Sequence, residues 1–264
     1  MQIEGAKILL TGASSGIGEA LAPMLAEKGA CVGVAARRED HLAATLARCQ
    51  HFSPESRMWV VDLSDVEAAV RLVDDAWTAF GWLDCLINNA AIGKRKHLVD
   101  HTASDLETVI RTNFLSPMRM NLAVLPKMLE RGSGTIVNVA SGGGRFGIGH
   151  ESAYCASKFA MTGWSEVAAM DLADTPIEVK LIQPGAIATE IWIPQPGDLP
   201  GLPGVEFATA EECASGIVEA LQTDGFEFFV PADLKASVDY KNGDLPGWID
   251  LMASIGRAKE PSPS

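Results

Sequence analysis

The sequence predicts an α/β fold in a single domain: a doubly wound sheet of about seven parallel strands with helices on both faces. Short apolar runs alternate with longer amphipathic segments along the chain. Several apolar runs are continuous rather than alternating, which is typical of strands that are buried on both faces. The 264 residues, 47% of them hydrophobic and 21% charged, suffice for one large core, and no internal repeat divides them.

The expected elements alternate from the first strand to the last. The strands are expected over residues 7–10, 31–35, 58–61, 85–88, 135–139, 179–182 and 226–230. The helices are expected over residues 17–28, 39–49, 66–80, 103–131, 152–173 and 210–222. Because right-handed crossovers connect parallel strands, this order produces a sheet that is wound in both directions from its centre.

All residues from 1 to 264 are assigned to this domain, with two special segments near its end. The stretch 193–203 holds four prolines and two glycines, which suit neither a helix nor a central strand. Long loops in compact domains often serve as lids, so residues 190–208 are expected to form a substrate loop or lid. Residues 231–264 are expected to form a C-terminal extension.

The composition excludes several classes of protein. A formal net charge of −13 argues against a nucleic-acid partner, although a local pocket can still bind an anionic cofactor. The five cysteines include no Cys-x-x-Cys pair, so neither a disulfide framework nor a zinc site is expected. His97 and His101 lie four residues apart without a third ligand, so no metal is expected.

No targeting or membrane segment is expected. The first residues run into a strand-like segment and lack the basic and apolar regions of a signal peptide. No apolar run reaches the ~20 residues that span a bilayer. The expected location is therefore the cytoplasm, without a membrane partner.

A glycine-rich turn follows the first expected strand and opens the first helix. Residues 11–18 read Thr-Gly-Ala-Ser-Ser-Gly-Ile-Gly. Glycines allow backbone N–H groups to approach a pyrophosphate, and the helix N-terminus favours its negative charge. The spacing differs from Gly-x-Gly-x-x-Gly, and such a turn could be purely structural. Its place at the first crossover of a doubly wound sheet favours a nucleotide.

Tyr154 and Lys158 lie four residues apart in an expected helix, and therefore one turn apart on the same face. A phenol with a pKa near ~10 is a poor acid–base catalyst, and a neighbouring cation lowers that pKa by favouring the phenolate. The hydroxyl of Ser141 could hydrogen-bond the same substrate oxygen. The pair alone is a weak signal, because many surface helices contain one by chance.

Taken together, these motifs resemble those of the short-chain dehydrogenase/reductase family. That family carries the glycine turn, Asn-Asn-Ala-Gly after the fourth strand, a helix Asn, a Ser, Tyr-x-x-x-Lys, and Pro-Gly after the sixth strand. This chain matches the pattern in order across residues 7–190, with the glycine turn at 11–18, Asn-Asn-Ala-Ala at 88–91 and Pro-Gly at 184–185. It departs at Ala91, where the family usually has Gly, and in its C-terminal extension.

The resemblance implies a Rossmann-type fold and reversible hydride transfer between a nicotinamide cofactor and a carbonyl or secondary alcohol. In the family pattern Tyr154 is the general acid/base, Lys158 tunes its pKa and binds the nicotinamide ribose, and Ser141 bonds the substrate oxygen. Asn113 is the fourth catalytic residue that the pattern implies, and it would hold a water molecule. The cofactor-binding residues that the pattern implies are Gly12, Ser14, Ser15, Gly16, Ile17, Gly18, Arg37, Arg38, Asp62, Leu63, Asn89, Ala90, Ala91, Tyr154, Lys158, Pro184, Gly185, Ile187 and Thr189.

Several of these residues have a structural alternative when they are read alone. Ser141 could be an ordinary turn serine, and Asn113 an ordinary helix amide. Asp62 could be a turn residue or a helix N-cap, and Pro-Gly pairs are common in turns.

Two arginines at the end of the second expected strand favour NADP(H) over NAD(H). An acid at that point holds the ribose 2′-hydroxyl of NAD, whereas an arginine meets the 2′-phosphate of NADP. Ala36 takes the position of the acid, and Arg37 and Arg38 follow it. The two arginines could instead be solvated charges that pair with Glu39 and Asp40.

Residues 142–149 and 190–207 are expected to line the substrate pocket, and their apolar side chains favour an uncharged, hydrophobic ketone or alcohol. The apolar residues could instead pack against the lid, and His150 could simply begin the helix that carries the tyrosine. The substrate contacts that we expect are Ser141, Phe146, His150, Tyr154 and Trp192.

A sensor that binds NADP(H) and a protein partner without turnover is the alternative hypothesis. It would have no need for Ser141, Tyr154 and Lys158 together. Relatives pair through the helices that correspond to residues 103–131 and 152–173, so the resemblance also implies a homodimer or homotetramer.

Overall fold

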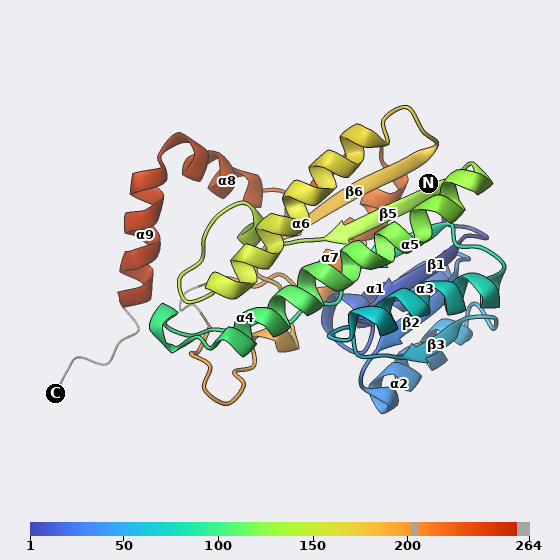
Figure 1. Ribbon diagram of the computed structural model, residues 1–264, viewed down its shortest axis with the longest axis horizontal. Coiled ribbons are helices and arrows are strands. Elements are labelled where there is room, and N and C mark those ends of the chain that lie inside the picture. Colours follow the sequence, from blue (N-terminus) through green and yellow to red (C-terminus); the bar gives the residue numbers. More distant parts are fainter. Residues whose placement is uncertain (202–204, 258–264) are drawn as a thin grey trace.

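The computed structural model describes residues 1–201 and 205–257, so residues 202–204 of the expected lid and 258–264 of the expected extension lie outside the described residues. Within the described ranges, seven strands form one sheet in the order β3-β2-β1-β4-β5-β6-β7, and all neighbouring strands are parallel. Helices cover both faces of this sheet (Figure 1). The predicted doubly wound α/β fold is confirmed.

The strands lie close to their predicted ranges. They are β1 (Lys7–Thr11), β2 (Cys31–Ala36), β3 (Arg57–Val60), β4 (Cys85–Asn88), β5 (Gly134–Val139), β6 (Ile177–Pro184) and β7 (Glu227–Val230). The central strands β1, β4 and β5 are almost completely buried, as their continuous apolar runs predict. The edge strand β3 has no buried residue, because its first and last residues are exposed and the two between them are half-buried.

Two helical layers enclose the sheet. On one face α1 (Gly16–Glu27) packs against α2 (Glu39–Gln50) and α7 (Ala210–Gln222), and on the other α3 (Val66–Phe80) packs against α5 (Ser116–Arg131). Each layer has its own apolar core against the sheet. The helix that carries the Tyr-x-x-x-Lys motif, α6 (Ser152–Asp171), packs on β6.

Local signals explain why the helices begin and end where they do. The carboxylate of Asp65 accepts the N–H groups of Glu67 and Ala68 at the start of α3, and Gly81 closes the helix in the left-handed conformation with φ 82°. Thr209 and Glu212 form a capping box at the start of α7.

The single helix expected over residues 103–131 is divided. It begins as α4 (Ala103–Ile110), passes through a π-helical turn over Arg111–Leu115, and continues as α5. Pro117 lies four residues after Asn113 and has no N–H to donate to the Asn113 carbonyl, so the regular α-helical bond cannot form there. A wider turn is a known response to such a missing bond.

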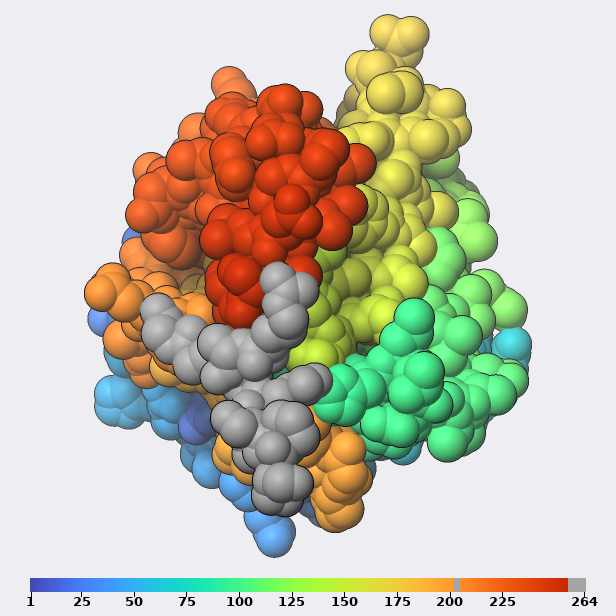
Figure 2. All heavy atoms as spheres, turned by 90° about the vertical axis from the view of Figure 1, so that its left-hand side faces the viewer, coloured from blue at the N-terminus to red at the C-terminus, as the bar shows by residue number. Residues whose placement is uncertain are grey.

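Two helices that the sequence patterns did not predict occupy the C-terminal extension. These are α8 (Leu234–Gly243) and α9 (Leu245–Arg257), which pack against each other. Asp244 accepts the N–H of Gly247 and so caps α9, and Pro246 stands in its first turn, where proline is tolerated. Figure 2 shows the pair in red beside the yellow start of α6.

The strand order reverses between β1 and β4, which both pair with neighbours on either side. Ligands of doubly wound sheets bind at such a point, beyond the carboxyl ends of the strands. Four of the sequence motifs lie at carboxyl ends of strands in this sheet: the glycine turn after β1, Asn-Asn-Ala-Ala at the end of β4, Ser141 after β5 and Pro-Gly at the end of β6. Among the described residues, no helix combines the length and apolar character that a bilayer crossing requires.

Candidate active site

A large pocket of about 1090 Å³ lies over the carboxyl ends of the strands. It reaches from the glycine turn after β1 to the C-terminal helix α9, and includes residues of the expected lid. Its volume slightly exceeds the roughly 300–1,000 Å³ that is typical of ligand pockets. A dinucleotide together with a small substrate can therefore share it.

The glycine turn needs its glycines because neighbouring backbone atoms come too close to leave room for a side chain. A Cβ on Gly12 would lie 2.7 Å from the Ala90 Cα, and a Cβ on Gly18 would lie 2.3 Å from the Gly12 carbonyl oxygen. Gly12 and Gly16 also have positive φ angles of 71° and 55°. Ser15 is the N-cap of α1 but its side chain makes no capping hydrogen bond to the helix, so the N-terminal amides of α1 are available to an anion.

The segment after β4 is joined to this turn by hydrogen bonds. The Asn89 and Ala90 N–H groups donate to the Thr11 hydroxyl over 3.1 and 3.2 Å, and the Asn89 amide donates to the Thr11 carbonyl over 2.9 Å. Ala91 lines the pocket, and its φ angle is not positive, so its backbone accepts a Cβ without strain. The departure from the family glycine is thereby accommodated.

Two arginines stand at the outer end of the pocket, after β2. The Arg38 guanidinium donates to the Ser14 carbonyl over 3.1 Å and lies 2.7 Å from the Glu190 carboxylate. Arg37 lies 4.0 Å from the Asp62 carboxylate, and both side chains are more than half exposed. The arginines therefore pair across the pocket, rather than with the neighbouring acids of α2 that the sequence suggested.

Ser141, Tyr154 and Lys158 meet in the middle of the pocket. The Tyr154 hydroxyl hydrogen-bonds the Ser141 side chain, whose oxygen also accepts the Gly143 N–H over 3.1 Å. The Lys158 ammonium donates to the Val139 carbonyl over 2.8 Å and lies 5.8 Å from the centre of the tyrosine ring. Residues from β5, the loop after it and α6 thus converge at one point.

Burial dominates the electrostatics of these groups. It lowers the pKa of Lys158, which is 1% exposed, to about 7. It also raises the pKa of Tyr154 well above the ordinary value, and the hydrogen bond from Ser141 offsets only part of this. The direction is opposite to the sequence expectation that a charged Lys158 lowers the tyrosine pKa.

Asn113 lies in the π-helical turn, completely buried. Its amide accepts the Ile92 N–H and donates to the Ile92 carbonyl, both over 2.9 Å, and donates to the Ser157 hydroxyl over 3.1 Å. The side chain therefore fixes the segment after β4 against α6 and does not line the pocket. Its water-holding role stays a prediction.

On the substrate side, four of the five expected contacts line the pocket, namely Ser141, Phe146, Tyr154 and Trp192, and His150 does not. Phe146 packs against Trp248 with ring centres 4.7 Å apart, and Trp192 donates its indole N–H to the Ile187 carbonyl over 2.8 Å. His150 adopts a φ of 67° and packs its ring against His97 at 4.8 Å. It is not among the lining residues.

The structure brings most of the predicted site residues to this pocket. Gly18, Asn113 and His150 do not line it, although the first two support residues that do. Those that line it are Gly12, Ser14, Ser15, Gly16, Ile17, Arg37, Arg38, Asp62, Leu63, Asn89, Ala90, Ala91, Ser141, Phe146, Tyr154, Lys158, Pro184, Gly185, Ile187, Thr189 and Trp192.

The pocket also contains residues that our site prediction left out. Arg95 and Glu151 form a buried ion pair in its wall, and Trp248 and Met252 of α9 border it. No motif marks the α9 residues, because they take part only through packing. A lone buried arginine cannot be recognised from one sequence.

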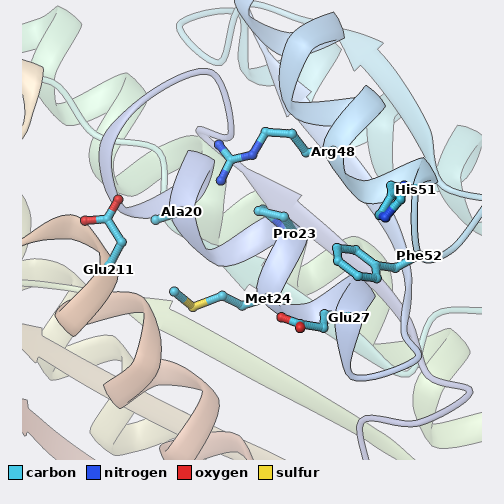
Figure 3. A pocket seen from close by; sticks show the side chains of 8 residues that line it. All are labelled: Ala20, Pro23, Met24, Glu27, Arg48, His51, Phe52 and Glu211. Carbon is cyan, nitrogen blue, oxygen red and sulfur yellow. The ribbon is translucent and has the colours of Figure 1, made fainter.

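A second, smaller pocket of about 360 Å³ lies between α1, α2 and α7 (Figure 3). It is lined by Arg48, His51 and Phe52 of α2 and its end, by four residues of α1, and by Glu211. None of the predicted site residues lines it. Within the described ranges, no group of three His, Cys, Asp or Glu side chains could hold a metal ion.

A family model described as short chain dehydrogenase matches residues 6–198, which is well over half of the chain. The chain belongs to the short-chain dehydrogenase/reductase family. It is therefore an NAD(P)-dependent oxidoreductase of the kind that acts on CH–OH and C=O groups. Nothing in these findings favours the sensor hypothesis.

Individual relatives agree with this assignment. The ketoacyl reductase HetN of Nostoc sp. is 30% identical over 229 residues, which cover 86% of this short-chain dehydrogenase and 79% of the relative. A short-chain dehydrogenase/reductase from Burkholderia phymatum, solved in complex with NAD, superposes with a TM-score of 0.84 at 24% identity and covers 100% and 99% of the two chains.

A second solved structure carries a different cofactor. The alcohol dehydrogenase of Thermococcus sibiricus, complexed with 5-hydroxy-NADP, has a TM-score of 0.75 at 23% identity and covers 86% of this chain and 96% of its own. At these identities the two structures establish the Rossmann-type fold. One binds NAD and the other an NADP derivative, so they leave the cofactor preference open.

Proposed function

We propose that this short-chain dehydrogenase transfers a hydride between NADP(H) and a carbonyl or secondary alcohol of a hydrophobic small molecule, with Tyr154 as general acid/base. The observation that carries the proposal is the convergence of Ser141, Tyr154 and Lys158 in the pocket that the glycine turn borders. When bound, the nicotinamide supplies or accepts the hydride. The protein's own groups orient the substrate and move the proton.

Proton donation is the natural task of Tyr154. Because burial raises its pKa, the phenol keeps its proton at neutral pH and can give it to a carbonyl oxygen during reduction. The Ser141 hydroxyl already hydrogen-bonds that phenol, so one substrate oxygen can accept a hydrogen bond from both. In the oxidation direction Tyr154 must first lose this proton, for which the neutral form of Lys158 is the nearby acceptor, and its phenolate then takes the proton of the alcohol.

Lys158 stands beside this pair. Its ammonium has the Val139 carbonyl as a partner and borders the pocket, where ribose hydroxyls of the cofactor can meet it. A pKa of about 7 leaves the group poised between its charged and neutral forms near neutral pH. It can therefore pass a proton toward Tyr154 as well as bind sugar hydroxyls.

The residues present fit a dinucleotide. Gly12 and Gly18 leave no room for side chains where the turn folds under the pocket, so backbone N–H groups are what the turn presents to a pyrophosphate. Asp62 and Leu63 line the pocket and would border the adenosine, and Pro184, Gly185 and Thr189 line it and would border the nicotinamide. These residues would hold the cofactor.

The proposed preference for NADP(H) rests on charge. Arg37 and Arg38 border the pocket beside Ala36, where an acid that would select NAD is missing. Both guanidinium groups are accessible, and each faces only one nearby carboxylate among the described ion pairs. A 2′-phosphate carries more charge than one carboxylate and can displace it.

The proposed hydrophobic substrate follows from the inner end of the pocket. Phe146, Ile148, Trp192, Trp248 and Met252 surround the space next to Tyr154. These apolar side chains beside the Ser141–Tyr154 pair, with the charges of Arg95 and Glu151 paired to each other in the wall, suit an uncharged molecule with a reactive oxygen. The segment 190–208 is the proposed lid of this space.

We also propose a homodimer or homotetramer. Leu106, Leu122 and Leu129 are exposed on α4 and α5, and Val167 and Met170 on α6, where Met170 is 72% exposed. Such apolar faces favour association with a second copy. Light scattering on the purified protein measures the mass, and fractionation of the native cells tests the expected cytoplasmic location.

The experiment that tests the enzyme mixes the purified protein with NADPH and a panel of apolar ketones and aldehydes, and follows the nicotinamide absorbance. We expect oxidation of NADPH with at least one member. Titrations with both reduced cofactors should give tighter binding of NADPH. Tighter binding of NADH would overturn the cofactor preference, and activity on anionic carbonyls alone would overturn the substrate class.

A further inference from the structure

Arg95 is a cation in an unusual place. It lies between β4 and the 3-10 turn at Leu98–Asp100, and its side chain is only 5% exposed. A buried guanidinium is costly unless its charge is paired and its N–H groups are bonded. The partners of Arg95 therefore indicate what the residue does.

Four of these contacts go to the expected lid. The Arg95 Nε donates to the Leu199 carbonyl over 3.2 Å, and its Nη1 donates to the Ile191 carbonyl over 3.0 Å. Its own carbonyl accepts the Leu199 N–H over 2.6 Å, and its guanidinium lies 5.3 Å from the centre of the Trp192 ring. One residue thus holds both ends of the segment 191–199.

The charge partner belongs to the catalytic side of the pocket. The Glu151 carboxylate lies 3.6 Å from the Arg95 Nη1, and its side chain is 6% exposed. Glu151 is the N-cap residue of α6, three positions before Tyr154. The ion pair therefore connects the loop after β4, the lid and the helix that carries the tyrosine.

We propose that Arg95 is a positioning residue that holds the segment 190–201 closed over the substrate pocket, with Glu151 as the counter-charge that ties the closed segment to α6. The lid carbonyls take hydrogen bonds that water would otherwise satisfy, so the closed position depends on the guanidinium. The pair is neutral as a whole and offers no net charge to an anionic substrate. The catalytic part of this inference rests on the proposed function.

Two variants separate the loss of the lid contacts from the cost of leaving the Glu151 carboxylate without its cation. Arg95→Met removes the lid contacts but leaves Glu151 buried without its cation, which can destabilise the fold. The double variant Arg95→Met with Glu151→Gln removes both charges and keeps the pocket wall filled. The matched control is Arg131→Met, because Arg131 also pairs with a carboxylate, that of Asp84, and donates to a backbone carbonyl, that of Leu83, outside the pocket.

The first measurement is hydrogen–deuterium exchange of the peptide that spans residues 190–201, which needs no substrate. We expect exchange about 10-fold faster in the double variant, on the scale of lost charged hydrogen bonds, and unchanged exchange in β1 and in the control. A double variant that melts cooperatively with unchanged exchange in this peptide would overturn the proposal. This result stands whether or not the protein turns over any carbonyl.

The second measurement is steady-state kinetics on an apolar carbonyl that the wild type reduces. We expect the double variant to raise KM about 10-fold while kcat stays within about 3-fold, because the lid is loosened and Tyr154 stays in place. A fall in kcat at unchanged KM would contradict a lid role. A KM effect that is confined to anionic substrates, with normal exchange, would make Arg95 a substrate-binding group instead and overturn the inference.

Discussion

The two ends of the large pocket are built in different ways. The proposed cofactor end consists of short motifs at the ends of neighbouring strands, where the backbone itself forms the surface. The proposed substrate end consists of side chains from the proposed lid, the loop after β5 and the helices α8 and α9, which lie far apart in the sequence. A backbone surface requires specific residues at fixed spacing, whereas a packed apolar wall requires only shape and volume.

Gly18 and Trp248 illustrate the contrast. A Cβ on Gly18 would lie 2.3 Å from a carbonyl oxygen, so no other residue fits without a shift of the turn. Trp248 fills the space against Phe146 and Val238 and donates its indole N–H to the Gly147 carbonyl, a contact that other large residues could replace in part. The cofactor end therefore restricts which amino acids can occupy its positions, whereas the substrate end restricts only the volume that its side chains fill.

The largest effect is expected where the two ends meet. Tyr154→Phe removes one hydroxyl and should lower turnover by ~100-fold or more, since it deletes the general acid. NADPH binding, measured by titration, should stay largely intact, which would separate the chemistry from the cofactor end.

The matched control for this change is Tyr240→Phe, because Tyr240 is the second tyrosine of the chain and is exposed on α8. It should keep normal turnover. Near-normal turnover in Tyr154→Phe itself would remove the role given to this residue.

The next largest effect is expected for Lys158→Met, which should change how the free energy of unfolding depends on pH. Its folded pKa is about 7, whereas an unfolded lysine titrates near ~10.4. Between these values the unfolded chain binds a proton that the folded chain does not, so wild type gains stability over Lys158→Met as pH rises. The gain should reach up to ~1.4 kcal/mol per pH unit between pH 7 and 9 in urea unfolding.

Below pH 7 both states carry the charge, and the difference between wild type and variant should no longer change. Lys235→Met serves as the control, since Lys235 is exposed and pairs with Asp239. A difference that is flat from pH 7 to 9 would show that Lys158 is charged throughout, and would contradict burial as its dominant influence.

A smaller effect is expected at the outer cofactor end. Arg37→Ser should weaken NADPH binding by ~10-fold and leave NADH binding nearly unchanged, because it removes a charge that only a 2′-phosphate needs. Fluorescence titration of both cofactors measures the ratio. Arg48→Ser removes the same charge from α2 next to the smaller pocket and should change neither (Figure 3). Equal losses for both cofactors would refute the phosphate contact.

The smallest effect is expected at the substrate end. Trp248→Leu keeps an apolar wall and reduces its volume, so KM for an apolar carbonyl should rise roughly 5-fold while NADPH affinity stays constant. Trp82→Leu, on the far side near Asp84, is the control. An unchanged KM in a stably folded Trp248 variant would place α9 outside the substrate contacts.

The same contrast explains what the sequence could predict. The seven strands, the glycine turn and the residues Ser141, Tyr154 and Lys158 follow from periodicity and motifs, since buried parallel strands and backbone turns restrict residue type. The helices α8 and α9 and the Arg95–Glu151 pair depend on contacts between distant segments, which one sequence does not record. The sequence predicts that Lys158 lowers the pKa of Tyr154, whereas burial raises it. Burial depends on how distant segments pack, and one sequence does not record that.

The π-helical turn at Arg111–Leu115 restricts how the length of this region can change. Each residue advances an α-helix by about 100°. A π-helical turn already holds one residue more than an α-helical turn, so a further insertion here would rotate α5 by that amount relative to α4 and turn its buried face, including Asn121 and Val124, away from the sheet. Related genes should therefore tolerate substitutions at Arg111 more readily than a one-codon insertion in this turn.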